Sequence, residues 1–240
     1  MADIRTIAIV LPAYNAAKTL ERCIKRIPHS LHADMILCDD ASADNTARES
    51  ERLKLITLRH PQNRGYGGNQ KTLYRYVLDH GYQYVIMLHP DDQYDPTVIP
   101  DMVKLLLEGT GFVMGNRMVG DQARLHGMPL WKRISNYLLS GFLRWIYGMQ
   151  LGEFHSGLRG YRADMLQRIP FERFTDNFSF DSEMIAAVAA CGATSGQVSV
   201  SCDYSPEASS VNFRTSVRYG LETVRVALRY KTGYYARLLK

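Results

Sequence analysis

The acidic stretch HPDDQYDP, residues 89–96, holds the side chains of this chain that are best placed for chemistry. It follows the apolar run Tyr84 to Leu88, so its carboxylates stand at the end of an expected buried strand. Mutual repulsion penalises such acidic density without a compensating cation, and oxygen ligands suit Mg²⁺ or Mn²⁺ that bridges to a nucleotide diphosphate. Asp91 and Asp92 are the candidate metal ligands, whereas Asp95, before a proline, is expected to cap a helix. The structural alternative is a solvated acidic turn.

A second acidic turn, CDDASADNT, begins at residue 38 and places Asp39 and Asp40 at another expected strand end. A carboxylate at that position can accept hydrogen bonds from a base N–H or from a ribose hydroxyl. The Ser, Asp, Asn and Thr residues that follow can equally cap the next helix. A nucleotide contact and a capped turn both remain open for this segment.

The glycine-rich segment NRGYGGNQ, residues 63–70, has neither the spacing nor the Lys-Ser/Thr pair of a P-loop, and it lacks GxGxxG. We interpret Gly65, Gly67 and Gly68 as a turn that lets a helix from Asn69 approach the sheet. Their backbone amides would still point toward the nucleotide side.

Apolar runs of strand length alternate with helix-length segments through the first half, a pattern typical of a parallel sheet covered by helices. Ligands bind beyond the carboxyl ends of the strands in such doubly wound α/β sheets, where the two acidic turns would meet. We predict strands at 6–11, 35–38, 55–59, 84–88 and 112–115, and helices at about 17–26, 45–52, 69–80 and 97–107.

The second half is less regular, with expected helices at about 131–149, from 181 and at about 215–230, and a strand within 192–204. The 240 residues, 46% of them hydrophobic, contain no linker and no repeat, so we expect one domain. Four scattered cysteines without CxxC spacing indicate neither a zinc site nor a disulfide framework. The N-terminal apolar run reads as a first strand, and no apolar stretch reaches the roughly 20 residues of a membrane span. We expect a soluble or peripheral cytoplasmic protein.

A formal net charge of +5 fits a protein that meets anionic partners. Residues 130–151 combine aromatic and basic side chains, which suits a bilayer interface or a lipid groove, with buried helix packing as the alternative. The basic run 214–240 is also compatible with anionic lipids. Nucleic acid is not an expected partner, because no recognition motif accompanies the charge.

The chain as a whole resembles the family 2 glycosyltransferases of GT-A fold, and within them the dolichyl- and polyprenyl-phosphate sugar transferases. The motifs that carry this resemblance stand in family order over about residues 5–215: LPAYN, CDDASADNT, NRGYGGNQKT, HPDDQYDP, GNRM, SGLRGYR and FSFDSEM. The resemblance implies a GT-A, Rossmann-like, mostly parallel sheet with helices on both faces in a single α/β domain, residues 1–215. A nucleotide-sugar half would span about 1–118 and an acceptor half about 119–215, before a basic amphipathic helix at 216–240.

The resemblance also implies a donor site. Pro12 and Tyr14 would pack on the nucleotide base, while Asp40, with Asp39 beside it, would bind the base or the ribose. The metal motif of the family, Asp-X-Asp followed by X-Gln, falls on residues 89–93.

Within that metal motif Asp91 is the matched carboxylate and Gln93 the matched amide. His89 replaces the first aspartate of the family motif, which leaves three alternatives open. His89 ligates Mn²⁺ through its imidazole, Asp92 takes over as ligand, or the site binds metal more weakly.

On the acceptor side, Arg117 matches an arginine that faces phosphate in relatives that use phospholipids, and Arg133 resembles its second partner. Two guanidinium groups suit a phosphate because they offer planar, permanently charged donors. The alternative for each is a surface arginine paired with an acidic residue.

The motif SGLRGYR implies that its Ser-Gly turn lies near the sugar and that Arg159 helps to order the site. His155, just before this turn, either contacts the donor sugar or is an inert turn residue. Asp181 and Glu183 fall where the wider family has its acidic base, with Asp181 as a helix cap as the competing interpretation. A hydroxyl acceptor needs such a base, whereas an ionised phosphate needs little help.

We therefore predict an inverting, metal-dependent transfer of a hexose from a UDP- or GDP-sugar to a polyprenyl or dolichyl phosphate, with Mg²⁺ or Mn²⁺ as cofactor. One alternative is transfer to a saccharide or lipid hydroxyl in the synthesis of cell-surface polysaccharide. Another is a non-catalytic nucleotide-sugar-binding module. The membrane surface is an expected partner in the first case.

Overall fold

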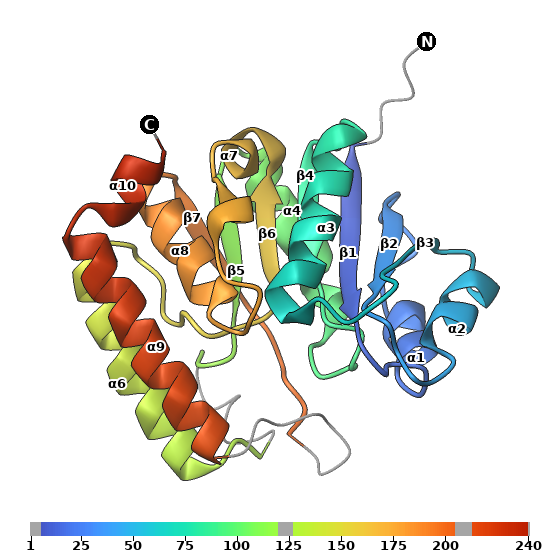
Figure 1. The fold of residues 1–240 in the computed structure, drawn as a ribbon, viewed down its shortest axis with the longest axis horizontal. Helices are drawn as coiled ribbons and strands as arrows, with labels where there is room; N and C mark the ends of the chain where they lie inside the picture. Colours follow the sequence, from blue (N-terminus) through green and yellow to red (C-terminus); the bar gives the residue numbers. More distant parts are fainter. Residues whose placement is uncertain (1–5, 120–126, 205–212, 240) are drawn as a thin grey trace.

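A seven-stranded sheet in the order β3-β2-β1-β4-β6-β5-β7 forms the centre of the molecule (Figure 1). The structure is a computed structural model that describes residues 6–119, 127–204 and 213–239. All neighbouring strands pair in parallel except β6, which runs antiparallel to both β4 and β5. The strands are β1 Ile7–Ala13, β2 Asp34–Asp39, β3 Ile56–Arg59, β4 Tyr84–Met87, β5 Phe112–Asn116, β6 Arg159–Arg162 and β7 Ser195–Ser199.

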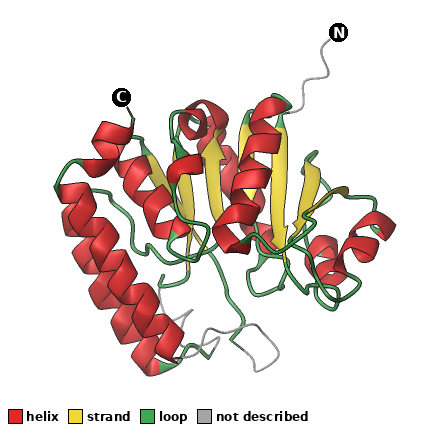
Figure 2. Cartoon of the chain, in the orientation of Figure 1, coloured by secondary structure: helices red, strands yellow, loops and turns green. Residues whose placement is uncertain are grey.

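Helices cover both faces of this sheet, as predicted (Figure 2). Successive side chains of a strand point to opposite faces, so Ala8 and Val10 join one core cluster while Ile9 and Leu11 join the other. The helices are α1 Leu20–Lys25, α2 Thr46–Arg52, α3 Gly65–Asp79, α4 Ile99–Leu107, α6 Leu130–Tyr147, α7 Ala163–Gln167, α8 Phe180–Ala190, α9 Phe213–Lys231 and α10 Tyr234–Leu238, with 3-10 turns at Pro96–Val98 and Phe171–Arg173.

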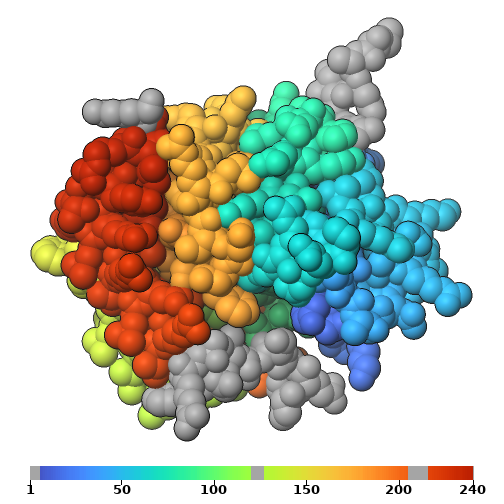
Figure 3. Space-filling view, viewed as in Figure 1, coloured from blue at the N-terminus to red at the C-terminus, as the bar shows by residue number. Residues whose placement is uncertain are grey.

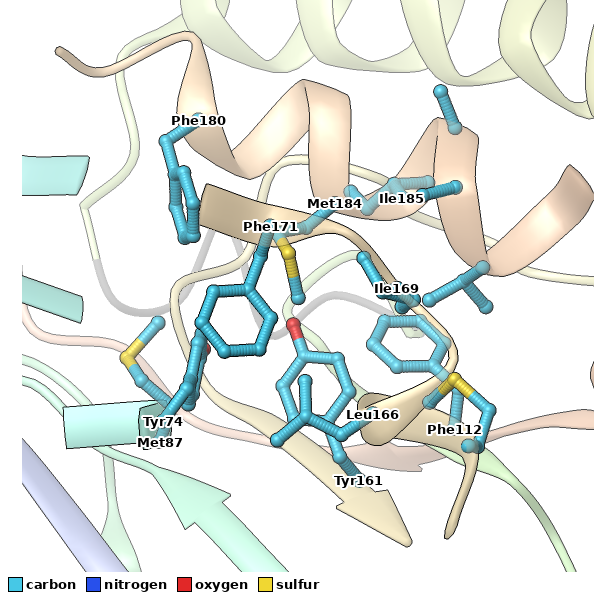
Figure 4. Close-up of a cluster of buried hydrophobic side chains, with 14 of the residues drawn as sticks. Tyr74, Met87, Phe112, Tyr161, Leu166, Ile169, Phe171, Phe180, Met184 and Ile185 are labelled. Carbon is cyan, nitrogen blue, oxygen red and sulfur yellow. The ribbon is translucent and has the colours of Figure 1, made fainter. Parts of the chain in front are cut away.

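The larger core cluster joins α3 and α8 to one face of the sheet (Figure 4). The Tyr74 ring of α3 packs edge-on against Tyr161 of β6 and Phe171, with centroids 5.6 and 5.8 Å apart. Phe180, the first residue of α8, stacks on Tyr74 at 6.3 Å. This aromatic packing fixes the start of α8 next to α3.

The antiparallel strand β6 was not predicted, and it determines what reaches the site. Its first residue, Arg159, pairs with Met87 at the end of β4 and with Met114 of β5. Since β6 runs opposite to its neighbours, it begins at the edge where they end. The Ser-Gly turn before β6 therefore lies at the carboxyl edge of the parallel strands.

Two further differences from the prediction concern helices. Helix α3 begins at Gly65 and not at Asn69, so the glycines form its first turn. The helix expected at about 215–230 is confirmed as α9, but the basic helix expected over 216–240 is divided into α9 and α10 around Gly233, which lies in the left-handed region, φ 73°. Helix α9 packs on α6 and α8, so it continues the α/β domain.

Candidate functional site

Asp40 lies at the carboxyl end of β2 and closes the start of α3. Its Oδ1 accepts the Arg64 N–H at 2.8 Å and lies 2.6 Å from His60 Nδ1, while its Oδ2 accepts the Gly65 N–H at 3.0 Å. The residue is 3% exposed, and Asp39 before it is buried too. A carboxylate at a helix N-terminus is stabilised by the free amides and by the helix dipole. Asp40 therefore caps α3, whereas the capping expected of this turn for the next helix, α2, comes from Asp44, whose Oδ1 accepts the Thr46 N–H at 2.9 Å. The predicted contact of Asp40 with a base or ribose stays a prediction.

Pro12 and Tyr14 occupy the exit of β1. Pro12 is buried and lies opposite Cys38 of β2, whereas Tyr14, one residue beyond the strand, is 57% exposed. The Tyr14 ring is thus free to pack against a planar ligand, which is the role predicted for it.

Two carboxylates of the HPDDQYDP turn are held by arginines of the α1 region. Asp92, 7% exposed, forms ion pairs with Arg22 and with Arg26, whose Nη1 lies 2.9 Å away. Arg26 also lies 3.1 Å from Asp95, and Asp95 accepts the Thr97 N–H as the predicted helix cap. The guanidinium groups relieve the acidic repulsion at Asp92, so this carboxylate is engaged as a structural partner.

Asp91 forms no ion pair with any residue in the part of the chain that the structure describes. Its Oδ1 accepts the Gln93 N–H at 3.1 Å, and both side chains are half-buried. Within residues 6–119, 127–204 and 213–239, no three His, Cys, Asp or Glu side chains gather as a ready-made metal cluster. Metals of phosphate-binding sites take one or two protein ligands and complete their shell with phosphate and water. Asp91 and the nearby His89 fit a site of that kind.

The His89 ring lies between Tyr66 of α3 and the Ser-Gly turn before β6. Its Nε2 is 3.0 Å from Tyr66 Oη, and the two rings stack with centroids 5.5 Å apart. A Cβ added to Gly157 would come within 2.5 Å of His89 Cδ2 and 2.6 Å of its Nε2, so glycine is required at this close approach. The Gly157 N–H donates to Tyr94 Oη at 2.7 Å. Sequence reasoning missed Tyr66, whose signal was a bulky residue inside a run of glycines.

Arg159 and Asp181 form a buried ion pair behind His89. Arg159 Nη2 donates to Asp181 Oδ2 at 2.7 Å, and its Nη1 lies 2.5 Å from Oδ1. Tyr66 Oη and Gln70 Nε2 donate to the same carboxylate at 2.8 and 3.0 Å. Burial acts to raise the pKa of Asp181, but Arg159 and these hydrogen bonds hold it below its usual range. Asp181 is therefore an ionised carboxylate of low basicity. The ordering role that the motif implies for Arg159 stays a prediction, and its observed contact is this ion pair.

Glu183 does not converge with Asp181. Residues two positions apart in an α-helix point to nearly opposite sides. Glu183 Oε2 accepts the Thr175 N–H and the Thr175 hydroxyl, both at 2.8 Å, and the residue is 4% exposed. Its contacts fix the loop before α8, so the structure does not bring the two predicted bases to one point.

Arg117 is engaged by Glu153, a residue that sequence reasoning missed. Glu153 is fully buried and accepts the Arg117 N–H and Nε–H at 2.8 Å each, as well as Asn136 Nδ2 at 2.7 Å. Arg117 also donates to the His155 carbonyl and to Tyr204 Oη, both at 3.1 Å. Although burial alone would raise the pKa of Glu153, Arg117 lowers it, so both groups are charged. An acidic residue inside the apolar run LGEFH was the only sequence signal for this pair.

Helix α6 adds Lys132 near Arg117, and Arg133 follows it in the chain. Burial lowers the pKa of Lys132, and the positive charge of Arg117 lowers it further, which shows that the two groups are neighbours. Arg133 is half-buried, and its side chain makes no hydrogen bond or ion pair with residues in the described ranges. A local excess of positive charge of this kind attracts anions.

His155 precedes the Ser-Gly turn, and both of its ring nitrogens are buried without a hydrogen-bond partner among the residues described. Its ring packs edge-on against Tyr219 of α9, with centroids 5.8 Å apart. Burial lowers the pKa of His155 to about 4; Glu153 opposes this effect, whereas Arg117 and Arg159 add to it. The ring is therefore neutral at neutral pH, and it leaves one buried donor and one buried acceptor unsatisfied.

An exposed apolar stripe runs along α6 and α9, which lie side by side at one margin of the molecule (Figure 1). Figure 3 shows α9, in red, at this margin of the surface. The exposed residues are Leu130 66%, Ile134 52%, Tyr137 73%, Leu138 66% and Trp145 73% on α6, and Val217 46%, Leu221 68% and Leu228 56% on α9. None of the described helices has the length and apolar character needed to cross a bilayer.

Known proteins that this chain resembles include glycosyltransferases. The sequence model described as Glycosyl transferase family 2 matches residues 8–169. A UDP-N-acetylglucosamine dolichyl-phosphate N-acetylglucosaminyltransferase of Methanococcus voltae is 24% identical over 97% of this chain and 98% of its own. An undecaprenyl-phosphate mannosyltransferase of Micrococcus luteus is 24% identical over 76% of this chain and 77% of that protein.

Solved structures share the fold. Glucosyl-3-phosphoglycerate synthase from Mycobacterium tuberculosis, in complex with Mn²⁺, UDP and phosphoglyceric acid, aligns with a TM-score of 0.69 and 19% identity. The alignment covers 94% of this chain and 78% of that one. The expected GT-A architecture is thereby confirmed, and the likeness bears on the fold alone.

Proposed function

The chain belongs to glycosyltransferase family 2, and from this premise we propose that it transfers a hexose, with inversion, from a nucleotide diphosphate sugar to a polyprenyl phosphate. The observation that carries the proposal is Asp91, a carboxylate at the exit of β4 without an ion pair among the described residues. The names of the relatives, which transfer sugars to dolichyl or undecaprenyl phosphate, support the choice of acceptor class.

On the donor side, the UDP- or GDP-sugar would lie along the carboxyl edge of β1, β2 and β4. Tyr14 would stack on the base, and Asp39 and Asp40 would meet the base or ribose at the start of α3. Asp91, with His89 and Gln93, would hold Mg²⁺ or Mn²⁺, which when bound supplies neutralisation of the charge on the departing diphosphate. Asp92 is left out of this ligand set because Arg22 and Arg26 engage it.

On the acceptor side, the state of the two predicted bases favours a phosphate over a hydroxyl. Asp181 accepts donors from three residues and has a lowered pKa, and Glu183 is bound to Thr175, so neither is poised to remove a proton. A phosphate is already ionised at neutral pH and attacks the anomeric carbon directly, opposite the leaving diphosphate. This single displacement inverts the anomeric centre and needs no covalent nucleophile.

The acceptor phosphate would be drawn to the cations around α6. Lys132 and Arg133 lie there without a carboxylate partner among the described residues, whereas the charge of the neighbouring Arg117 is balanced by Glu153. The lipid tail would leave along the apolar stripe of α6 and α9, with the protein peripheral to the cytoplasmic face of a membrane.

The test is transfer of radiolabelled hexose from UDP- or GDP-sugars into the organic phase with a short-chain polyprenyl phosphate, with and without Mn²⁺. We expect Asp91→Asn to lose at least about 100-fold in activity, because charge stabilisation of the leaving group is lost. Asp92→Asn is the matched control, which should lower stability while its activity still responds to Mn²⁺. Two results would overturn the metal assignment: full activity of Asp91→Asn, or full transfer by chelator-treated wild type to which no divalent ion has been added back.

A further inference from the structure

The hydroxyl of Tyr66 joins His89 to Asp181, and the chemistry of the three groups fixes the direction of both hydrogen bonds. An ionised carboxylate accepts only, so Tyr66 Oη must donate to Asp181 Oδ2, 2.8 Å away. With its single hydrogen committed, Tyr66 Oη can only accept from His89 Nε2, 3.0 Å away. Nε2 of His89 therefore carries a hydrogen.

The other ring nitrogen of His89 is then free as an electron-pair donor. A metal binds an imidazole through its unprotonated nitrogen, and with the hydrogen on Nε2 that nitrogen is Nδ1. Nδ1 makes no hydrogen bond to a residue that the structure describes, and the ring is half-buried next to the Asp91 turn. Metal-binding histidines commonly use one nitrogen for the metal while the other donates to a fixed acceptor.

We propose that His89 binds the divalent cation of the donor site through Nδ1, and that Tyr66 and Asp181 are positioning residues that fix this tautomer. The proposal rests on the proposed function, which supplies the nucleotide diphosphate that completes the metal shell. It assigns a role to the histidine that replaces the first aspartate of the family motif.

The hydrogen-bonded side chains behind His89, those of Tyr66 and Asp181, are held in place by further contacts, as such positioning requires. Gln70 donates to Asp181 Oδ1, and Arg159 donates to Oδ2, the oxygen that also accepts from Tyr66. Gly157 closes on the Nε2 edge of the His89 ring. The Gly67 N–H donates to the Asp176 carbonyl at 2.8 Å, so the first turn of α3 is tied to the loop before α8. These contacts restrain the separation of Tyr66 and Asp181.

A nitrogen ligand changes which metals the site favours. Imidazole suits the later first-row ions, whereas carboxylate, carbonyl and water suit Mg²⁺. We expect the ratio of Co²⁺ to Mg²⁺ affinity, measured with UDP or GDP bound, to fall about tenfold in His89→Asp, which restores an all-oxygen set.

The direct test is pulsed electron paramagnetic resonance of Mn²⁺ bound with UDP or GDP, without turnover. Wild type should show the ¹⁴N coupling of a directly bound imidazole, and His89→Asp should bind Mn²⁺ without it. Tyr66→Phe should weaken Mn²⁺ binding about tenfold or more and diminish the coupling, while metal-free nucleotide affinity stays unchanged.

The matched control is Tyr76→Phe, on the same helix, whose ring stacks on His80 with centroids 3.8 Å apart. It should keep wild-type coupling and affinity. Mn²⁺ bound without ¹⁴N coupling, or Tyr66→Phe indistinguishable from Tyr76→Phe, would overturn the inference and leave the proposed function standing. Failure of Mn²⁺ to bind with either nucleotide would instead overturn both.

Discussion

His155 is a residue whose buried ring should make the protein less stable in mild acid. With a pKa of about 4 in the folded chain against 6.5 in the unfolded one, the unfolded state alone binds a proton between these values. The folded state therefore loses stability as the pH falls from 6.5 to 4, by roughly 2–3 kcal/mol. We expect His155→Phe to be at least as stable as wild type at pH 7, since it removes two buried polar atoms that lack a partner among the described residues, and to lack this pH-dependent loss.

Urea unfolding of both proteins at pH 7 and pH 5 measures this difference. His80→Phe, at the exposed C-cap of α3, is the control for the replacement of a histidine by phenylalanine outside the core. Parallel pH profiles for wild type and His155→Phe would show that the ring is not held neutral by burial.

Residues at strand ends could be located from the sequence, but their partners could not. Asp91, Asp92 and Asp95 were placed at the edge of the sheet by the apolar run before them, and the cap at Asp95 is confirmed. The ion pair between Asp92 and Arg26 joins side chains 66 positions apart, which no local pattern encodes. Glu153 was missed for the same reason: its partner, Arg117, comes next to it only in the folded chain, so the sequence does not indicate that this acid is buried in an ion pair.

The contact between α3 and the loop before α8 is the element-scale feature that brings Tyr66 to Asp181. A Cβ on Gly67 would lie 2.5 Å from the Thr175 carbonyl oxygen and 2.8 Å from Phe180 Cβ. We expect Gly67→Ala to cost about 1–3 kcal/mol of unfolding free energy, because two backbone segments must separate. Gly141→Ala is the control: nothing lies within 4 Å in the middle of α6, so the change should stabilise by up to about 1 kcal/mol. Equal effects in chemical denaturation would contradict this account.

The helices and strands of the first half could be predicted because their apolar residues recur with a regular spacing and turn-forming residues mark where they end. Strand β6 could not, since Arg159–Arg162 spans four residues, two of them arginines, and its place between β4 and β5 comes from tertiary pairing. The start of α3 was placed four residues late because Gly67 and Gly68 have low helix propensity. Tertiary contact of those glycines with residues 175–176 overrides that propensity.

The exposed apolar side chains of α6 and α9 lie at one margin of the molecule and suit contact with a lipid surface. Burying an exposed leucine in the interfacial region is worth about 1.5–3 kcal/mol, and a glutamate there adds repulsion from anionic headgroups. We therefore expect Leu221→Glu, at a position 68% exposed on α9, to weaken binding to vesicles containing anionic lipid by about tenfold or more. Leu107→Glu, 58% exposed on α4, matches it in chemistry and should bind as wild type. Sedimentation with the vesicles measures both variants, and equal loss in the two would mean that charge alone, without a defined face, governs the association.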